Sequence, residues 1–329
     1  MATLRVPDMV PTPEEDAQKL REALQGVPLS STLPLWKGYG VDEKSVIRIL
    51  GHRNATQRKQ IREIYHQLYN EDLIDCINSE IAGDFKDALI LWTYDPAERH
   101  ARLAKESLKK KFSVKHLQVI VEIACASSPY HLIEVRKAYC SLFDCSLEED
   151  IVSVVPFALR KLLLGLVSSF RYDKELVDAE LAKSEADVLH HAITSKRFDD
   201  DKVVHILSTR NFYQLRLTFE CYGYKHANSI EEDIKNGGKG DLVSLLKMVI
   251  LCIDTPEMHF AEVIRDSILG IGTDEEALNR VIVTRAEIDM KNIKEVYPHM
   301  YKCTVEDDVV GDTSGSYKNF LLTLTGDKY

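Results

Sequence analysis

The chain has 329 residues, 45% of them hydrophobic, and a formal net charge of −10 at pH 7. This composition is sufficient for a substantial core, while the negative charge opposes unaided binding to nucleic acid or to an anionic membrane, so we expect no nucleic-acid partner. No apolar run approaches the roughly 18 residues of a membrane-spanning helix, the first residues lack the apolar stretch of a secretory signal, and the seven cysteines include no CxxC pair. We therefore expect a globular cytoplasmic protein with reduced thiols.

One unit occurs four times along the chain. Similar apolar segments end at residues 53, 127, 210 and 285, and a second similar segment ends 27 residues after each of them. Apolar residues recur at steps of three and four, without the two-residue alternation of strands. The pattern predicts an all-α fold of four repeats, each of about five short helices. We expect the tail to be residues 1–13 and the repeats, here called copies one to four, to be 14–93, 94–170, 171–253 and 254–329.

Copy one begins with a helix signal and carries an insertion. Thr12, with a proline after it and a glutamate three positions on, is typical of a capped helix start. Compared with the other copies, about eleven residues are extra in the segment 27–37, where two prolines would end the first helix. The sequence WKGYGVDE follows, with glycines at Gly38 and Gly40, and Asp42 is placed to cap the next helix.

Copy four contains a similar loop, GIGTDEE, with glycines at Gly270 and Gly272. Thr273 is placed to cap the following helix, and Glu276 would complete a capping box. The loop lies among carboxylates, which favours a cation over the anion that often binds at a helix start.

The glycine loop and a distant acid occur together or not at all. The separation from the first glycine to this acid is 42 residues both from Gly38 to Glu80 and from Gly270 to Asp312. In copies two and three the glycine position holds Phe112 and Ser195, and the acid position holds Val154 and Gly237. If the glycines only connected helices and the acids were only solvated, this joint loss would have no explanation.

This covariation predicts a site for a hard cation. Calcium takes about six to eight oxygen ligands and accepts backbone carbonyls, but a carboxylate is needed to supply charge. Glycines allow the backbone angles that turn several carbonyls toward one centre. We therefore predict Ca2+ sites in copies one and four.

These features resemble the annexin family over nearly the whole chain. The resemblance rests on loops close to the form KGxGT[DE], on the acid about forty residues later, and on GDTSGSYKNFLLTL at 311–324. Loops of this form only in copies one and four, the short tail, and ALILWTYDPAERHA at 88–101 are similar to the plant-type branch. The resemblance implies a disc in which each repeat is five helices wound into a right-handed superhelix.

Carried over by position, the resemblance implies two sets of calcium ligands. They are the carbonyls of Trp36, Gly38 and Gly40 with the Glu80 carboxylate, and the carbonyls of Ile268, Gly270 and Gly272 with the Asp312 carboxylate. Tyr39 and Ile271, each between two glycines, are expected at the loop tips in contact with lipid. Because the insertion precedes Trp36, we expect the site of copy four to be the better formed.

The function implied is Ca2+-dependent binding to anionic phospholipid by a protein that is not an enzyme. It would be cytoplasmic and would become peripheral to membranes when Ca2+ rises. Self-association on membranes and binding to actin are further partners that the resemblance allows. A calcium-permeable membrane channel is the alternative, and a peroxidase or nucleotide phosphatase activity is a third hypothesis.

Three residues bear on the enzymatic and redox hypotheses. His52 matches a histidine proposed for peroxidase activity in plant-type annexins, but a lone histidine supplies no haem pocket, and we interpret it as a helix-end residue. Cys125 and Cys252 match a suggested redox cluster, and we interpret them as buried, inert thiols. The chain has no GxxxxGK[ST] loop for a nucleotide.

Overall fold

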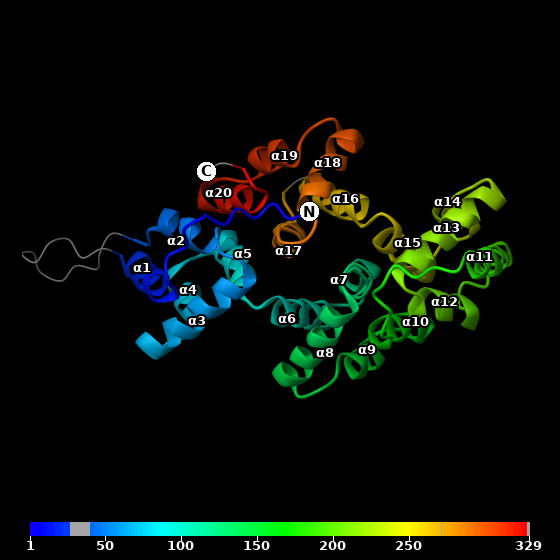
Figure 1. The fold of residues 1–329 in the computed structure, drawn as a ribbon, viewed down its shortest axis with the longest axis horizontal. Coiled ribbons are helices and arrows are strands. Elements are labelled where there is room, and N and C mark those ends of the chain that lie inside the picture. The colour runs from blue at the N-terminus through cyan, green and yellow to red at the C-terminus, as the bar shows by residue number, and fades with distance from the viewer. Residues whose placement is uncertain (27–39, 271, 328–329) are drawn as a thin grey trace, which may run out of the picture. The chain divides into compact units, whose positions relative to one another are not determined.

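The computed structural model describes residues 1–26, 40–270 and 272–327, and these residues form twenty α-helices and no strand (Figure 1). The expected all-α fold is therefore confirmed. The chain divides into two compact units, residues 1–96 with 260–329 and residues 97–259, which we call the first and the second unit. Their boundaries fall within the first turns of α6 and α16.

The first unit contains the helices of copies one and four. Those of copy one are α1 (Pro13–Gln25), α2 (Glu43–Leu50), α3 (Ala55–Tyr69), α4 (Leu73–Glu80) and α5 (Gly83–Thr93). Those of copy four are α16 (Pro256–Ile268), α17 (Glu275–Arg285), α18 (Met290–Tyr301), α19 (Val305–Asp312) and α20 (Gly315–Leu324).

The second unit contains the helices of copies two and three. Those of copy two are α6 (Pro96–Lys109), α7 (Val114–Cys125), α8 (Pro129–Phe143), α9 (Leu147–Val154) and α10 (Phe157–Ser168). Those of copy three are α11 (Ala179–Thr194), α12 (Asp201–Thr209), α13 (Phe212–His226), α14 (Ile230–Gly237) and α15 (Asp241–Asp254).

The fourth helix of every copy has eight residues and ends at the position of the predicted acid. These helices are α4, α9, α14 and α19, and their sequences are the second repeated segments. Each begins with a side-chain cap, provided by Asp72, Ser146, Ser229 and Thr304, and the last three form capping boxes. The constant spacing in the sequence therefore reflects one local structure, which places the acid position at a helix end next to a turn.

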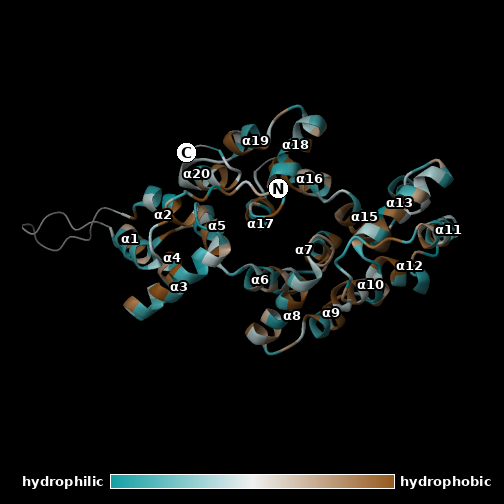
Figure 2. Ribbon diagram, viewed as in Figure 1, coloured by the Kyte–Doolittle hydropathy of each residue, from teal (hydrophilic) through white to brown (hydrophobic). Residues whose placement is uncertain are grey.

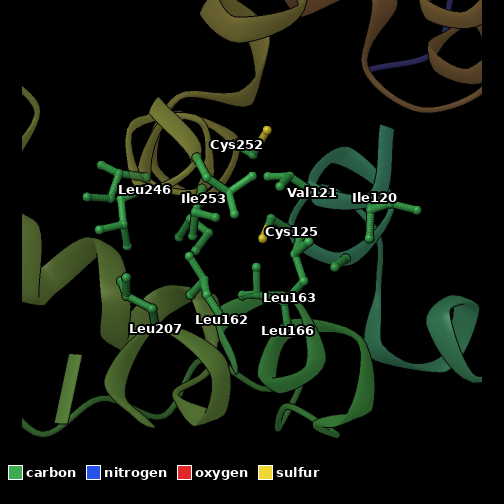
Figure 3. Packing of buried hydrophobic residues seen from close by; sticks show 14 of the residues in the cluster. Ile120, Val121, Cys125, Leu162, Leu163, Leu166, Leu207, Leu246, Cys252 and Ile253 are labelled. Carbon is green, nitrogen blue, oxygen red and sulfur yellow. The ribbon is translucent and has the colours of Figure 1, made fainter. Parts of the chain in front are cut away.

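Apolar faces of the helices form a core in each unit. In the second unit, α7, α10 and α15 contribute side chains such as Val121, Leu163 and Ile253, which point toward one another (Figure 3). In the first unit, the buried Trp92 donates from Nε1 to the Leu50 carbonyl at 2.8 Å. Figure 2 shows polar and apolar residues mixed along the helices, as amphipathic helices require.

None of the helices in the described parts of the chain is both long enough and apolar enough to cross a bilayer.

Candidate calcium-binding loops

The loop of copy four connects α16 to α17 and turns at two glycines. Gly270 has a φ of 124° and Gly272 a φ of 89°, a region that residues with a side chain rarely adopt. A Cβ at either position would meet no atom within 4 Å, so backbone conformation, and not crowding, requires glycine. The Asp274 N–H donates to the Ser267 carbonyl at 2.7 Å and closes the base of the loop. Ile271, the predicted lipid contact, lies outside the described residues.

The predicted carboxylate lies beside this loop. Asp312 is the last residue of α19, and its Oδ2 accepts a hydrogen bond of 2.5 Å from the Thr273 hydroxyl. Ile268, the predicted leading carbonyl, is the last residue of α16 and directly precedes the loop. The structure thus brings together the acid and the residue that follows Gly272, while Ca2+ coordination by these groups stays a prediction.

The cap expected for α17 is wrong by one residue. Asp274, and not Thr273, is the N-cap, because the Asp274 Oδ1 accepts from the Ala277 N–H at 3.1 Å. In copy one the expected cap is confirmed, since Asp42 Oδ1 accepts from the Ser45 N–H at 3.1 Å. The Asp274 cap leaves the Thr273 hydroxyl available to hold the Asp312 carboxylate.

Only part of the copy-one site lies in the described residues. Trp36, Gly38 and Tyr39 fall within 27–39, outside them. Gly40 is exposed. Glu80 is the exposed last residue of α4, and its Oε1 accepts from the Ser79 hydroxyl at 3.4 Å. Coordination through these residues also stays a prediction.

The described residues before and after the insertion are an end of a helix and a hydrogen-bonded residue. Helices α1 and α16 both have 13 residues, but α1 ends at Gln25, well before the glycines of copy one. At the other end, the Asp42 N–H donates to the Ala23 carbonyl in the last turn of α1 at 2.8 Å. The described residues on the two sides of the insertion are therefore joined by a backbone hydrogen bond.

Both loops belong to the first unit, and a contact connects their surroundings. Glu43, the first residue of α2, accepts a hydrogen bond from the Ser316 hydroxyl near the start of α20. That helix begins three residues after Asp312. The end of the copy-one loop and the acid of copy four therefore approach the same helix.

The surroundings of the copy-four loop are electronegative. The pKa of Tyr317 in α20 is raised, first by burial and then by the carboxylates of Asp84, Glu275 and Asp312. No group of three or more His, Cys, Asp or Glu side chains in the described ranges is arranged to hold a metal. Backbone carbonyls with one carboxylate stay the predicted donor set for Ca2+, and the negative field of these carboxylates would attract a cation.

An apolar contact replaces the loop-to-acid contact in copy three. Phe198 and Gly237 have the same separation of 39 residues as Thr273 and Asp312. Phe198 is 9% exposed, and a Cβ at Gly237 would lie 3.3 Å from its Cζ. The Phe198 ring thus occupies the space that an acid at this position would need. Sequence comparison of positions 273 and 198 could have shown this pair, because both lie 39 residues before the acid position.

In copy two the acid position holds Val154, which is the last residue of α9 and 41% exposed. The helix that follows the loop is capped by Ser113, whose hydroxyl accepts from the His116 N–H. Copy two therefore has neither the carboxylate nor the paired glycines.

The peroxidase and redox hypotheses depend on His52, Cys125 and Cys252. The His52 Nδ1 hydrogen-bonds the Arg5 carbonyl at 2.8 Å. Cys125 and Cys252 are 2% and 1% exposed in the core of the second unit (Figure 3). Burial raises the pKa of Cys125 to about 12, which keeps its thiol protonated and unreactive near neutral pH. All seven cysteines are described, and none forms a disulfide.

Comparisons with known proteins agree with this arrangement. The Annexin family model matches residues 35–92, 184–249 and 259–324. Annexin D3 of Arabidopsis thaliana is 52% identical over 100% of both chains, and the annexin-like protein RJ4 of Fragaria ananassa is 45% identical over 95% of both.

Solved structures show the same fold. Annexin III superposes with a TM-score of 0.88 at 30% identity, covering 100% of this chain and 98% of that one. A calcium-bound annexin (Sm)1 superposes with a TM-score of 0.85 at 26% identity, covering 100% of this chain and 94% of that one. With a relative that is 52% identical over the full length of both chains, and with family-model segments in three of the four copies, this chain belongs to the annexin family.

Proposed function

We propose that this protein binds anionic phospholipid membranes through Ca2+ held by the loops of copies one and four. The observation that carries the proposal is the contact between Thr273 and Asp312, which places a carboxylate beside a loop whose glycines have positive φ. The family supports it, since calcium-bound members have the same fold.

In copy four, each group has a separate role. The carbonyls of Ile268, Gly270 and Gly272 would provide neutral oxygens, and the Asp312 carboxylate would provide charge. The Thr273 hydroxyl positions that carboxylate before the ion arrives. A bound Ca2+ would offer remaining coordination positions to lipid phosphate, which allows an acidic protein to attach to an acidic surface.

We propose that the copy-one site is weaker. Its acid, Glu80, accepts a hydrogen bond from the hydroxyl of its chain neighbour Ser79, and Val41 stands where copy four has the hydroxyl of Thr273. Valine cannot donate a hydrogen bond to the carboxylate. Because both loops are in one compact unit, even a weak second site would add avidity on a membrane.

This function would make the protein cytoplasmic at low Ca2+ and peripheral to membranes when Ca2+ rises, with membrane binding and not catalysis as its activity. The hydrogen bond from His52 to the Arg5 carbonyl supports a structural role for this histidine.

The deciding experiment is co-sedimentation with phosphatidylserine vesicles across a Ca2+ series, with and without chelator. We expect sedimentation only with Ca2+, and a higher Ca2+ requirement for Asp312→Asn. The matched control is Asp173→Asn, which removes the same charge from an exposed residue of the second unit. Sedimentation that is unchanged by chelator would contradict the proposal. An equal change of the Ca2+ requirement in both variants would contradict it as well.

A further inference from the structure

A pocket of about 600 Å3 lies in the first unit, at the end of the α1–α2 pair that is remote from the calcium loop. Its walls are residues 5–7 and 11 of the N-terminal segment, the first half of α1, the end of α2 and the two residues His52 and Arg53. The loop of copy one instead joins the end of α1 to the start of α2. A ligand in this pocket would therefore not share groups with the calcium site.

The carboxylate that lines the pocket is already neutralised. Asp16 and Arg53 form a buried ion pair, with Nε to Oδ2 at 2.6 Å and Nη2 to Oδ1 at 2.8 Å. The remaining Arg53 nitrogen, Nη1, donates to the His52 carbonyl at 3.1 Å. This bidentate geometry uses both carboxylate oxygens of Asp16. The charge of Asp16 is therefore balanced by Arg53 and does not neutralise the other cations of the pocket.

Three further cations line the same pocket. The side chains of Arg5, Lys19 and Arg48 belong to exposed residues. None of the three forms an ion pair with a carboxylate in the described part of the chain, whereas other cations of this unit do, such as Arg21 with Glu71. In a chain with a net charge of −10, the pocket is a local concentration of positive charge, and its concave walls focus that potential.

The N-terminal wall is held in place. The His52 ring donates from Nδ1 to the Arg5 carbonyl at 2.8 Å, because a carbonyl can only accept. Two residues earlier, Thr3 donates from its N–H to the Ala286 carbonyl at 2.9 Å and from its hydroxyl to the Leu324 carbonyl at 2.7 Å. The segment that carries Arg5 is thus attached before any ligand binds, which lowers the cost of ordering it.

We propose that this pocket binds a small organic phosphate. Arginine and lysine side chains are the groups that recognise phosphate oxygens, and three of them that form no ion pair with a described carboxylate would supply the charge. The wall also contains Val6, Pro7, Pro11 and Ile49, which form an apolar surface for the organic part of the ligand. The proposal goes beyond calcium-dependent membrane binding and does not rest on it.

The test is calorimetric titration of the full chain with phenyl phosphate and with inorganic phosphate in chelator. Wild-type protein should bind both, and phenyl phosphate more tightly because of the apolar wall. In the double variant Lys19→Glu with Arg48→Glu, affinity should fall by at least about tenfold, since charge-assisted hydrogen bonds are lost. The matched control, Lys59→Glu with Lys291→Glu, reverses two exposed cations of the same unit outside the pocket and should change affinity by less than about twofold.

Absence of binding by the wild type, or an equal loss in the control, would overturn the proposal. Circular dichroism and Ca2+-dependent sedimentation with phosphatidylserine vesicles should be unchanged in the double variant, which separates this pocket from the proposed calcium function. A second arm uses phosphatidylcholine vesicles that contain a phosphatidylinositol phosphate, in chelator. If the wild type sediments with these vesicles and the double variant does not, the source of the phosphate is a lipid headgroup. If the wild type binds phenyl phosphate but does not sediment with these vesicles, the ligand is a soluble phosphate.

Discussion

Replacement of Gly272 by alanine should weaken Ca2+ binding without unfolding the protein. Gly272 has a φ of 89°, and a Cβ there would meet no atom within 4 Å. The methyl group therefore causes no clash, and its cost is backbone strain of about 1–3 kcal/mol. Since the loop is exposed, we expect it to relax away from the conformation that presents its carbonyls. Ca2+ binding would then have to restore the strained conformation, so the free energy of Ca2+ binding would become weaker by the same amount, about 1–3 kcal/mol. This corresponds to roughly a 5- to 150-fold loss of Ca2+ affinity.

The assay is the Ca2+ midpoint of vesicle co-sedimentation, with thermal unfolding measured in parallel. Gly311→Ala is the matched control, because Gly311 precedes Asp312 within α19, lacks a positive φ, and also has no atom within 4 Å of an added Cβ. In a helix this change should be neutral or should stabilise the protein by about 0.5–1 kcal/mol. We therefore expect an unchanged midpoint for Gly311→Ala and a raised midpoint for Gly272→Ala.

An unchanged Ca2+ midpoint for Gly272→Ala would refute the reasoning, because it would mean that the observed backbone angle is not needed for coordination. A drop in melting temperature that accounts for the full strain of about 1–3 kcal/mol would also refute it, since the strain would then have stayed in the fold. About 1 kcal/mol retained in the folded loop would lower the melting temperature by only roughly 2–4 °C.

Three further predictions concern the site and its support. Asp312→Asn should raise the Ca2+ requirement for vesicle binding more than Glu80→Gln, and the reverse order would show that the insertion leaves copy one intact. Ile271→Ser should weaken vesicle binding at saturating Ca2+ by up to about thirtyfold if this side chain inserts into lipid, and unchanged affinity with an intact circular dichroism spectrum would exclude insertion. Burial raises the pKa of Asp308, but hydrogen bonds from Tyr297 and Arg265 outweigh it and hold the pKa below the ordinary 3.8. The stability that the Asp308 carboxylate contributes is therefore present above pH 3.8 and is lost as pH falls through the lowered pKa. Asp308→Asn should reduce the free energy of unfolding, measured in urea, by about 1–3 kcal/mol at neutral pH and by less at acid pH. An equal cost at both pH values would contradict this assignment.

The fold could be predicted because each copy repeats its local signals. The caps at Ser146, Ser229 and Thr304 each start an eight-residue helix that ends at the same position of its copy. Local hydrogen bonds and apolar periodicity determine these elements, and both are visible in a single sequence. The division into two compact units was not predicted, because packing between copies depends on contacts that have no sequence period.

The site was only partly predictable, because its key contact is long-range. The spacing of 42 residues indicated that Asp312 belongs with Gly270, but not that Thr273 would donate to it. From the sequence alone, Thr273 with Glu276 three positions later is as consistent with a capping box as Asp274 is with a cap. Which of the two side chains caps the helix depends on which one has another hydrogen-bond partner. That partner, Asp312, is distant in sequence.

The exchange in copy three shows why glycines and acid disappear together. In copy four, the Thr273 hydroxyl faces a carboxylate at the end of a helix, in a place open to water and ions. In copy three, the Phe198 ring packs on Gly237 at the equivalent helix end, and any side chain at Gly237 would press against that ring. An acid introduced there alone would lose hydration against an aromatic face and would have no loop carbonyls to share an ion with. In copy three, the apolar contact between Phe198 and Gly237 therefore takes the place of the ion-binding arrangement, and an acid at this helix end would have no ion to share.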